Sequence, residues 1–195
     1  MKKLIAMLLA LVMVLSLAAC GGKQAEPEVT EPEVTEPEVV VPASALEILE
    51  NVWALYGDDE KFPVMGGDVN NMVDGAPGTY GLEDTESLSF QLLVPAEEVS
   101  NIDDAASLFH GMMLNNFTCG AFHVTGDADA FASAMVGAVK NNQWMCGMPE
   151  TMLVAVVGGE YVVMAFGIND AMTPFIAKLG EAYPDAVIVS NEPVA

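Results

Sequence analysis

The sequence contains no arginine, and its 195 residues include only six lysines against 28 aspartates and glutamates. Nucleic-acid binding needs clustered cations that displace counterions from phosphates, so that class of function is excluded. Recognition of a phosphate or carboxylate ligand would lack the guanidinium group that usually binds it. Anionic lipid headgroups should also repel a chain whose formal net charge is −22 at pH 7.

Histidine and cysteine are scarce as well, with two and three residues, and this limits the available chemistry. Cys119 and His123 are about 13 Å apart along a predicted strand, which is too far for a catalytic pair. No closely spaced Cys or His pair indicates a zinc site. Segment 68–75 resembles a calcium loop, but Met72 stands where an oxygen ligand is needed. We therefore predict no catalytic residue, no metal site and no cofactor.

The N-terminus has the features of a secretory signal. Lys2 and Lys3 precede an apolar run at 4–17, and small residues then lead to Cys20 in Leu-Ala-Ala-Cys-Gly. The run is shorter than the ~20 residues that span a membrane, so a cleaved signal peptide over 1–19 is favoured. Cysteine directly after the small residues resembles the bacterial lipoprotein signal, or lipobox.

That resemblance implies that the Cys20 thiol receives diacylglycerol and becomes the first residue after cleavage. Two acyl chains hold a protein stably on a bilayer, whereas one holds it only marginally. We therefore expect a palmitate-carrying lipoprotein on the extracytoplasmic face of the cell membrane. Its partners would include the lipid bilayer, reached through Cys20.

Residues 20–43 are predicted to be the lipid anchor and an extended acidic linker. Glu-Pro-Glu-Val-Thr occurs at 26–30 and again at 31–35, and Glu-Pro-Glu-Val follows at 36–39. Proline removes backbone donors, and the glutamates repel one another. Residues 44–195 then remain as a single globular domain that can bury a sizeable core.

Hydrophobic periodicity predicts an α+β domain with a mainly antiparallel sheet and helices packed on it. A capping box at Ser44 to Glu47 starts an N-terminal helix over 45–56. The extra strand-helix pair that follows the irregular segment 57–86 consists of a strand over 87–92 and a helix over 102–115. The predicted core-facing residues are Leu88, Phe90 and Leu92 in the strand, and Ala105, Leu108, Phe109 and Met112 in the helix. Asp103 and Asp104 would lie in the first turn of the second helix and complement its dipole.

The C-terminal part, 117–190, has the ferredoxin-like β-α-β-β-α-β order. Its predicted elements are a strand at 117–124, a helix at 127–141, a hairpin at 152–157 and 161–166 with a Gly-Gly turn, a helix at 170–181 and a strand at 186–190. Element order alone does not determine which strands are neighbours in the sheet.

The whole layout resembles small uncharacterised lipoproteins of Gram-positive anaerobes, including a domain-of-unknown-function family. The resemblance depends on the lipobox, the acidic spacer, Tyr80-Gly81, and the hairpin and helix around Gly159-Glu160-Tyr161-Val162-Val163. It implies the cellular location and the fold type. It carries over no catalytic residue.

Lipidation of Cys20 leaves Cys119 and Cys146 as the remaining cysteines. Helix 127–141 should bring the loop 142–150 back to the start of strand 117–124, close to Cys119. A disulfide there would close a loop of about 27 residues and stabilise the fold by roughly 3.5 kcal/mol. Two buried thiols, or a redox-active pair, are the alternatives that the sequence leaves open.

The loop also contains the most apolar irregular stretch, Trp144-Met145-Cys146-Gly147-Met148. One interpretation is a plug that completes the core. The other is an exposed patch of Trp144, Met145 and Met148 that receives a partner.

Two functions follow as hypotheses. The first is a non-catalytic binding or interaction module at the membrane, with an envelope protein or a small ligand as its partner. The alternative is a cell-envelope enzyme that uses acidic residues only, which would require a pocket lined by two or more partly buried acids. The sequence predicts no oligomeric state.

Replacing Cys20 by alanine should abolish palmitate incorporation and leave the uncleaved precursor, because the thiol that accepts the lipid is lost. Metabolic labelling and electrophoresis measure both effects. The control Cys146→Ser should be labelled and cleaved like the wild-type chain. Continued labelling of Cys20→Ala would contradict lipid attachment at this residue.

Overall fold

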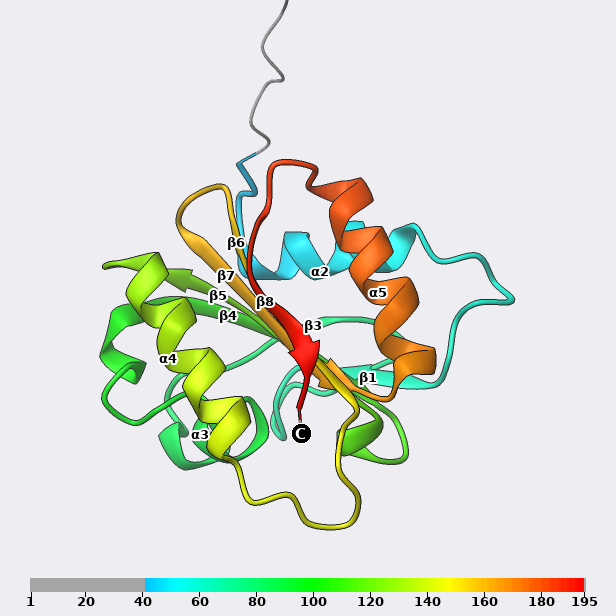
Figure 1. Cartoon of the computed structure of the whole chain (residues 1–195), viewed down its shortest axis with the longest axis horizontal. Coiled ribbons are helices and arrows are strands. Elements are labelled where there is room, and N and C mark those ends of the chain that lie inside the picture. Colours follow the sequence, from blue (N-terminus) through cyan, green and yellow to red (C-terminus); the bar gives the residue numbers. More distant parts are fainter. Residues whose placement is uncertain (1–40, 195) are drawn as a thin grey trace, which may run out of the picture. The chain divides into compact units, whose positions relative to one another are not determined.

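An eight-stranded antiparallel sheet with helices on both faces forms the centre of the fold (Figure 1), which confirms the predicted α+β class. The structure is a computed structural model that describes residues 41–194, so Cys20 and the repeats at 26–39 lie outside the described residues. In chain order the elements are α2 (Ala45–Ala54), β1 (Val64–Gly66), β2 (Val73–Asp74), β3 (Gly78–Thr79), α3 (Thr85–Gln91), η1 (Val99–Asn101), β4 (Ile102–His110), η2 (Leu114–Asn116), β5 (Phe117–Val124), α4 (Ala128–Asn141), β6 (Thr151–Val157), β7 (Tyr161–Gly167), α5 (Asn169–Ala182) and β8 (Val187–Pro193).

The C-terminal elements follow the predicted β-α-β-β-α-β order, but their sheet is not arranged as in a ferredoxin-like fold. The sheet order is β2-β1-β4-β5-β7-β6-β8, with β3 paired to β4. In a ferredoxin-like sheet β8 would pair with β5. Here β4 already occupies that edge of β5, and β8 pairs with β6 instead.

This strand order explains why helices cover both faces. The crossover β5-α4-β6 passes over β7, and the crossover β7-α5-β8 passes over β6, so both move in the same direction across the sheet. The strands from which they start, β5 and β7, are antiparallel. Since crossovers between parallel strands are strongly right-handed, α4 and α5 must lie on opposite faces. In Figure 1 the sheet separates them, with α3 beside α4 and α2 beside α5.

Two hydrophobic clusters result, one on each face of the sheet. The first lies beneath α2 and α5 and includes Cys119, and the second lies beneath α3 and α4 and includes Phe122. Because side chains alternate along a strand, residues only a few positions apart on β5 belong to different clusters. A sheet buried on both faces also explains the long apolar runs of its central strands.

The predicted strand over 87–92 is wrong, because this segment is part of α3. Asp84 caps the helix and accepts a hydrogen bond from the Ser87 backbone N–H at 3.0 Å. Leu88 and Leu92, four residues apart, are buried on one side of the helix. In a strand Phe90 would share their face, but in the helix it is 70% exposed.

The predicted helix over 102–115 is also wrong, because residues 102–110 form β4. This strand pairs with β5 and is covered on both faces, with Leu108 in one cluster and Phe109 in the other. A strand buried on both sides has no polar alternation, so periodicity does not distinguish it from a buried helix. Met112, predicted to face the core, is 86% exposed.

Asp103 and Asp104 therefore do not lie in a helix. Asp103 is paired with His123 on β5. Asp104 accepts a hydrogen bond from the backbone N–H of Ala45, at 2.7 Å, at the N-terminus of α2. Its carboxylate complements a helix dipole as predicted, but the helix is α2, which is distant in the sequence.

Most of the remaining predictions of local structure agree with the structure. The capping-box serine, Ser44, accepts a hydrogen bond from the Glu47 backbone N–H at 3.1 Å and starts α2. Segment 57–86 contains only the short strands β1, β2 and β3. The β6-β7 turn lies at the predicted Gly158 and Gly159, which have positive φ, but Glu160 also belongs to it. The loop between the paired Val157 and Tyr161 therefore has three residues rather than the predicted two. Among the described residues, no helix has the length and apolar character to cross a membrane.

Tyr56, directly after α2, has a buried hydroxyl group with no hydrogen-bond partner among the described residues. Its ring packs against Trp53, with ring centroids 4.7 Å apart, and lies 4.8 Å from Lys178 Nζ. Burial, together with the nearby Cys119 and Glu60, raises the pKa of the Tyr56 phenol. The hydroxyl therefore stays neutral, and its desolvation is not compensated by a hydrogen bond.

Tyr56→Phe should raise the free energy of unfolding by about 1 kcal/mol, because it removes this hydroxyl and keeps the ring contacts. The matched control is Tyr183→Phe, which deletes a hydrogen bond of 2.9 Å between Asn51 Nδ2 and the Tyr183 hydroxyl. That control should lose about 1 kcal/mol in urea unfolding. Equal losses in both variants would contradict the assignment of an unsatisfied hydroxyl to Tyr56.

Candidate functional site

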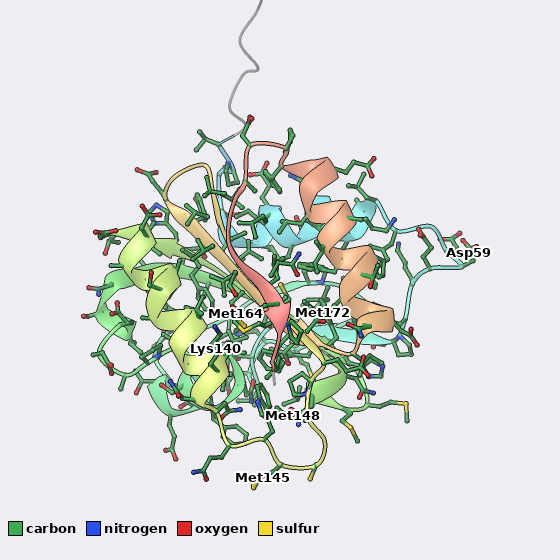
Figure 2. All side chains as sticks on the ribbon, in the orientation of Figure 1. Asp59, Lys140, Met145, Met148, Met164 and Met172 are labelled. Atoms are coloured by element: carbon green, nitrogen blue, oxygen red, sulfur yellow. The ribbon has the colours of Figure 1, made fainter. Side chains whose placement is uncertain are left out.

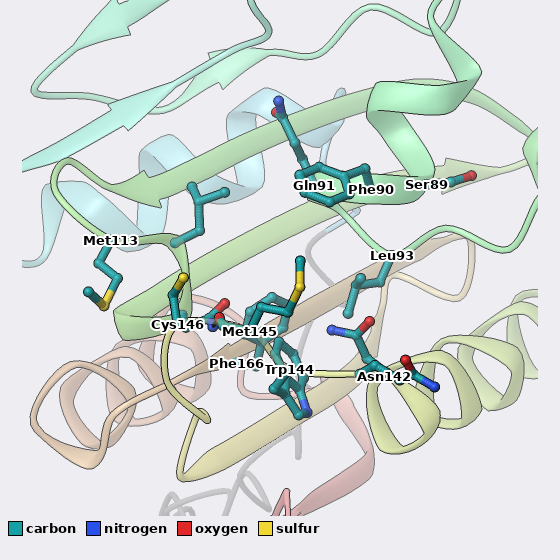
Figure 3. A pocket seen from close by; sticks show the side chains of 13 residues that line it. Ser89, Phe90, Gln91, Leu93, Met113, Asn142, Trp144, Met145, Cys146 and Phe166 are labelled. Atoms are coloured by element: carbon teal, nitrogen blue, oxygen red, sulfur yellow. Dashed lines mark hydrogen bonds between the residues drawn. The ribbon is translucent and has the colours of Figure 1, made fainter.

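A groove of about 380 Å³ lies between α3, the segment before β5, and the loop after α4 (Figure 3). We call it the methionine groove, and its lining consists of residues 89–91, Leu93, 113–115, 142–146 and Phe166. Its volume is within the 300–1,000 Å³ range that is typical of ligand pockets. The three segments are distant in sequence, and the order of the elements around the sheet brings them together.

Asn115 fixes the loop 142–150 against the start of β5. Its side-chain amide donates to the backbone carbonyls of Met145, at 2.7 Å, and of Gly147, at 2.6 Å. Both N–H groups of one amide are therefore used to hold the residues on either side of Cys146. Cys146 itself has φ of 62°, a left-handed conformation that is uncommon for a residue with a side chain.

The structure combines both interpretations of the loop. Trp144 packs on Phe166 of β7 with ring centroids 4.8 Å apart, so it acts as the plug that completes the core. Met145 is 72% exposed, and Met148 is half exposed. Figure 2 shows Met145 at the outer edge of the molecule, whereas the buried Met164 and Met172 lie close to the sheet. The predicted patch thus consists of two exposed methionines and a half-buried tryptophan in the same loop.

The exposed apolar surface extends beyond the predicted patch. A second hollow of about 130 Å³ shares Gln91 and Leu114 with the methionine groove and adds exposed Val69 and Met72. Sequence reasoning missed the exposed apolar residues that surround the two hollows, namely Met72, Phe90, Met112, Met113 and Leu114. The signal was present in the consecutive residues Met112, Met113 and Leu114, which the predicted helix had placed partly in the core.

The lining of the methionine groove carries no charged side chain, although the chain has 28 acidic residues. Its polar side chains are one serine and four amides, Gln91, Asn115, Asn142 and Gln143. An amide side chain offers both a donor and an acceptor, which matches the hydrogen-bonding groups of a peptide. Exposed methionine and phenylalanine add adaptable apolar contact area. The groove is suited to an uncharged ligand.

The predicted disulfide between Cys119 and Cys146 is not formed, and both residues are free thiols. The loop does return to the start of β5, but alternation along the strand turns Cys119 toward α2 and α5, whereas α4 delivers the loop on the other face. Cys119 is buried, and burial raises the pKa of its thiol well above the usual value. Cys146 is exposed, so the alternative of two buried thiols holds for Cys119 alone.

A separate hollow of about 60 Å³ is lined by three acids, Asp68, Glu83 and Asp84. Burial raises the pKa of Asp68, but hydrogen bonds from the backbone N–H groups of Gly81, Asn70 and Asn71 outweigh it and leave the pKa low. Hydrogen bonds from Ser87 likewise lower the pKa of Asp84. A general acid needs a raised pKa and space for a substrate, whereas Asp68 and Asp84 have lowered pKa values and the hollow is small.

Asp68 also explains the segment that resembles a calcium loop. Its carboxylate accepts from the backbone of its own loop, at 2.7 Å from Asn70 and 3.0 Å from Asn71, which is an Asx-turn arrangement. Within residues 41–194, no group of three or more His, Cys, Asp or Glu side chains is placed to hold a metal ion.

Comparisons of this chain with protein-family models, with curated proteins and with solved structures gave no match.

Proposed function

We propose that this chain is a lipid-anchored binding module on the extracytoplasmic face of the membrane. Its methionine groove receives an uncharged, largely apolar peptide segment of another envelope protein. The observation that supports this most is the uncharged lining, with Phe90, Met113 and Met145 exposed, in a domain that is otherwise strongly acidic. Exposed apolar surface that surrounds a groove is typical of an interaction site.

The amide side chains favour a peptide over a purely apolar ligand. Asn142 and Gln143 lie beside Trp144 in the lining, so donors and acceptors stand next to an aromatic ring. A peptide that lays apolar side chains on the methionines can pair its backbone groups with these amides. Methionine-rich surfaces adapt to different apolar sequences, because the side chain is unbranched and flexible.

The position of the groove suits a tethered module. The described chain enters the domain near the Ala45–Asp104 hydrogen bond, at one end of the sheet. The loop after α4, which lines the groove, lies at the opposite end (Figure 1). A linker over 21–43 in polyproline II form would allow a distance of up to about 70 Å between the domain and a lipid on Cys20.

Photo-crosslinking in cells tests this proposal. A photoreactive phenylalanine analogue is placed at Phe90, in the groove, or at Val187, an exposed apolar residue on the edge strand β8. We expect the analogue at position 90 to capture one recurrent, uncharged and apolar peptide of an envelope protein, identified by mass spectrometry. Adding Met145→Lys should suppress the adduct, because an apolar peptide that binds in the groove would have to bury the new charge.

The control position should give no such adduct. Peptides captured equally at 90 and 187, charged peptides without a common sequence, or an adduct that survives Met145→Lys would each contradict peptide binding in the groove.

A further inference from the structure

Sulfur atoms gather around the methionine groove. Met113, Met145 and Cys146 line it, and Met148 follows two residues after Cys146 in the same loop (Figure 3). All three methionines are exposed, and Cys146 is an exposed free thiol. Methionine is usually buried, so three exposed thioethers beside an exposed thiol need an explanation.

The Asn115 clamp holds the two segments that carry these sulfurs against each other. Asn115 donates to the carbonyls of Met145 and Gly147, which flank Cys146, and Met113 is only two residues before Asn115 in the chain. One side of the groove is thus held to the other by two hydrogen bonds of 2.6–2.7 Å. The clamp fixes the backbone and leaves the flexible methionine side chains free to reorient toward a ligand.

The donor set is chemically specific. Thiolate and thioether sulfur are soft ligands, and together they select Cu(I) among the common biological metal ions. Calcium and magnesium need oxygen ligands, and the groove lining has no carboxylate. Zinc sites are built from cysteine, histidine and carboxylate, of which the lining offers only Cys146.

We propose that Cys146, Met113 and Met145 bind one Cu(I) ion at the methionine groove, with Met148 as a further thioether within the same loop. The thiol of Cys146 releases its proton to solvent as its sulfur binds the ion, so the copper–thiolate unit is neutral and suits an uncharged lining. The strongly acidic domain raises the local concentration of cations around the groove. No change in oxidation state is involved.

The test is a competition for Cu(I) between the full mature chain, in detergent micelles, and the coloured chelator bicinchoninate under anaerobic conditions. The chain should withdraw one equivalent of Cu(I). Cys146→Ser should weaken binding by more than the roughly 10–100-fold that loss of an outer-shell partner costs. The double variant Met113→Leu with Met145→Leu should lose at least about tenfold, since leucine keeps the apolar volume and removes the sulfur.

Met72→Leu is the matched control, because Met72 is equally exposed but lines the neighbouring hollow, and its affinity should not change. Thermal unfolding checks that each variant folds, and Met145→Leu alone provides a milder change. Retention of all copper by the chelator, or unchanged affinity in Cys146→Ser, would overturn the site. Wild-type Cu(I) affinity in the variant Met113→Leu with Met145→Leu would also overturn the site, because the Cys146 thiol would then bind the ion without the thioethers.

Copper binding and peptide binding can fail independently. The Met→Leu variants keep the apolar surface, so photo-crosslinking at position 90 should persist in them while Cu(I) affinity falls. Loss of crosslinking with intact Cu(I) binding would contradict the peptide proposal only.

Discussion

Two crossovers in this fold move in the same direction across the sheet while the strands that they connect run in opposite directions. A right-handed crossover then has to place α4 on one face and α5 on the other. The sheet becomes the middle of three layers, and most side chains of its central strands are buried on one face or the other. Since α4 leaves the sheet on the face that α3 also covers, the loop after α4 meets α3 there. The methionine groove is the space between them.

The hydrogen bonds that finish this arrangement are few and specific. Asn115 holds the loop at Met145 and Gly147, and Asp104 holds the start of α2 at Ala45. Both contacts join segments that are at least thirty residues apart in the sequence. In each contact a polar side chain forms a hydrogen bond with a backbone group that has no partner within a helix or strand. The first positions the site, and the second positions the helix near the linker.

Much of the fold could be predicted from the sequence where local signals agree. The Ser44 cap and the Gly158-Gly159 turn each combine a characteristic residue with a clear hydrophobic pattern. The two errors are adjacent, at 87–92 and 102–115, and have physical causes. The first segment alternates like a strand over only six residues, and the second lacks polar alternation because both of its faces are buried.

These errors hid half of the site. The methionines of the loop could be recognised from the sequence, because an apolar stretch in an irregular segment is unusual. Phe90 and Met112 could not, because assigning them to the wrong element placed them in the core. The pairing of Cys119 with Cys146 failed for a related reason. The topology brought the loop to the correct end of β5, but the face to which Cys119 points depends on the position of α4.

The sheet separates Cys119 from the groove that contains Cys146. Alkylation of the full mature chain tests this separation directly, in the native state and after denaturation, each with and without reductant. We expect one thiol, at Cys146, to react in the native protein, and the second, at Cys119, to react only after unfolding, with no effect of reductant. Equal native reactivity of both cysteines, or labelling that appears only after reduction, would contradict this arrangement.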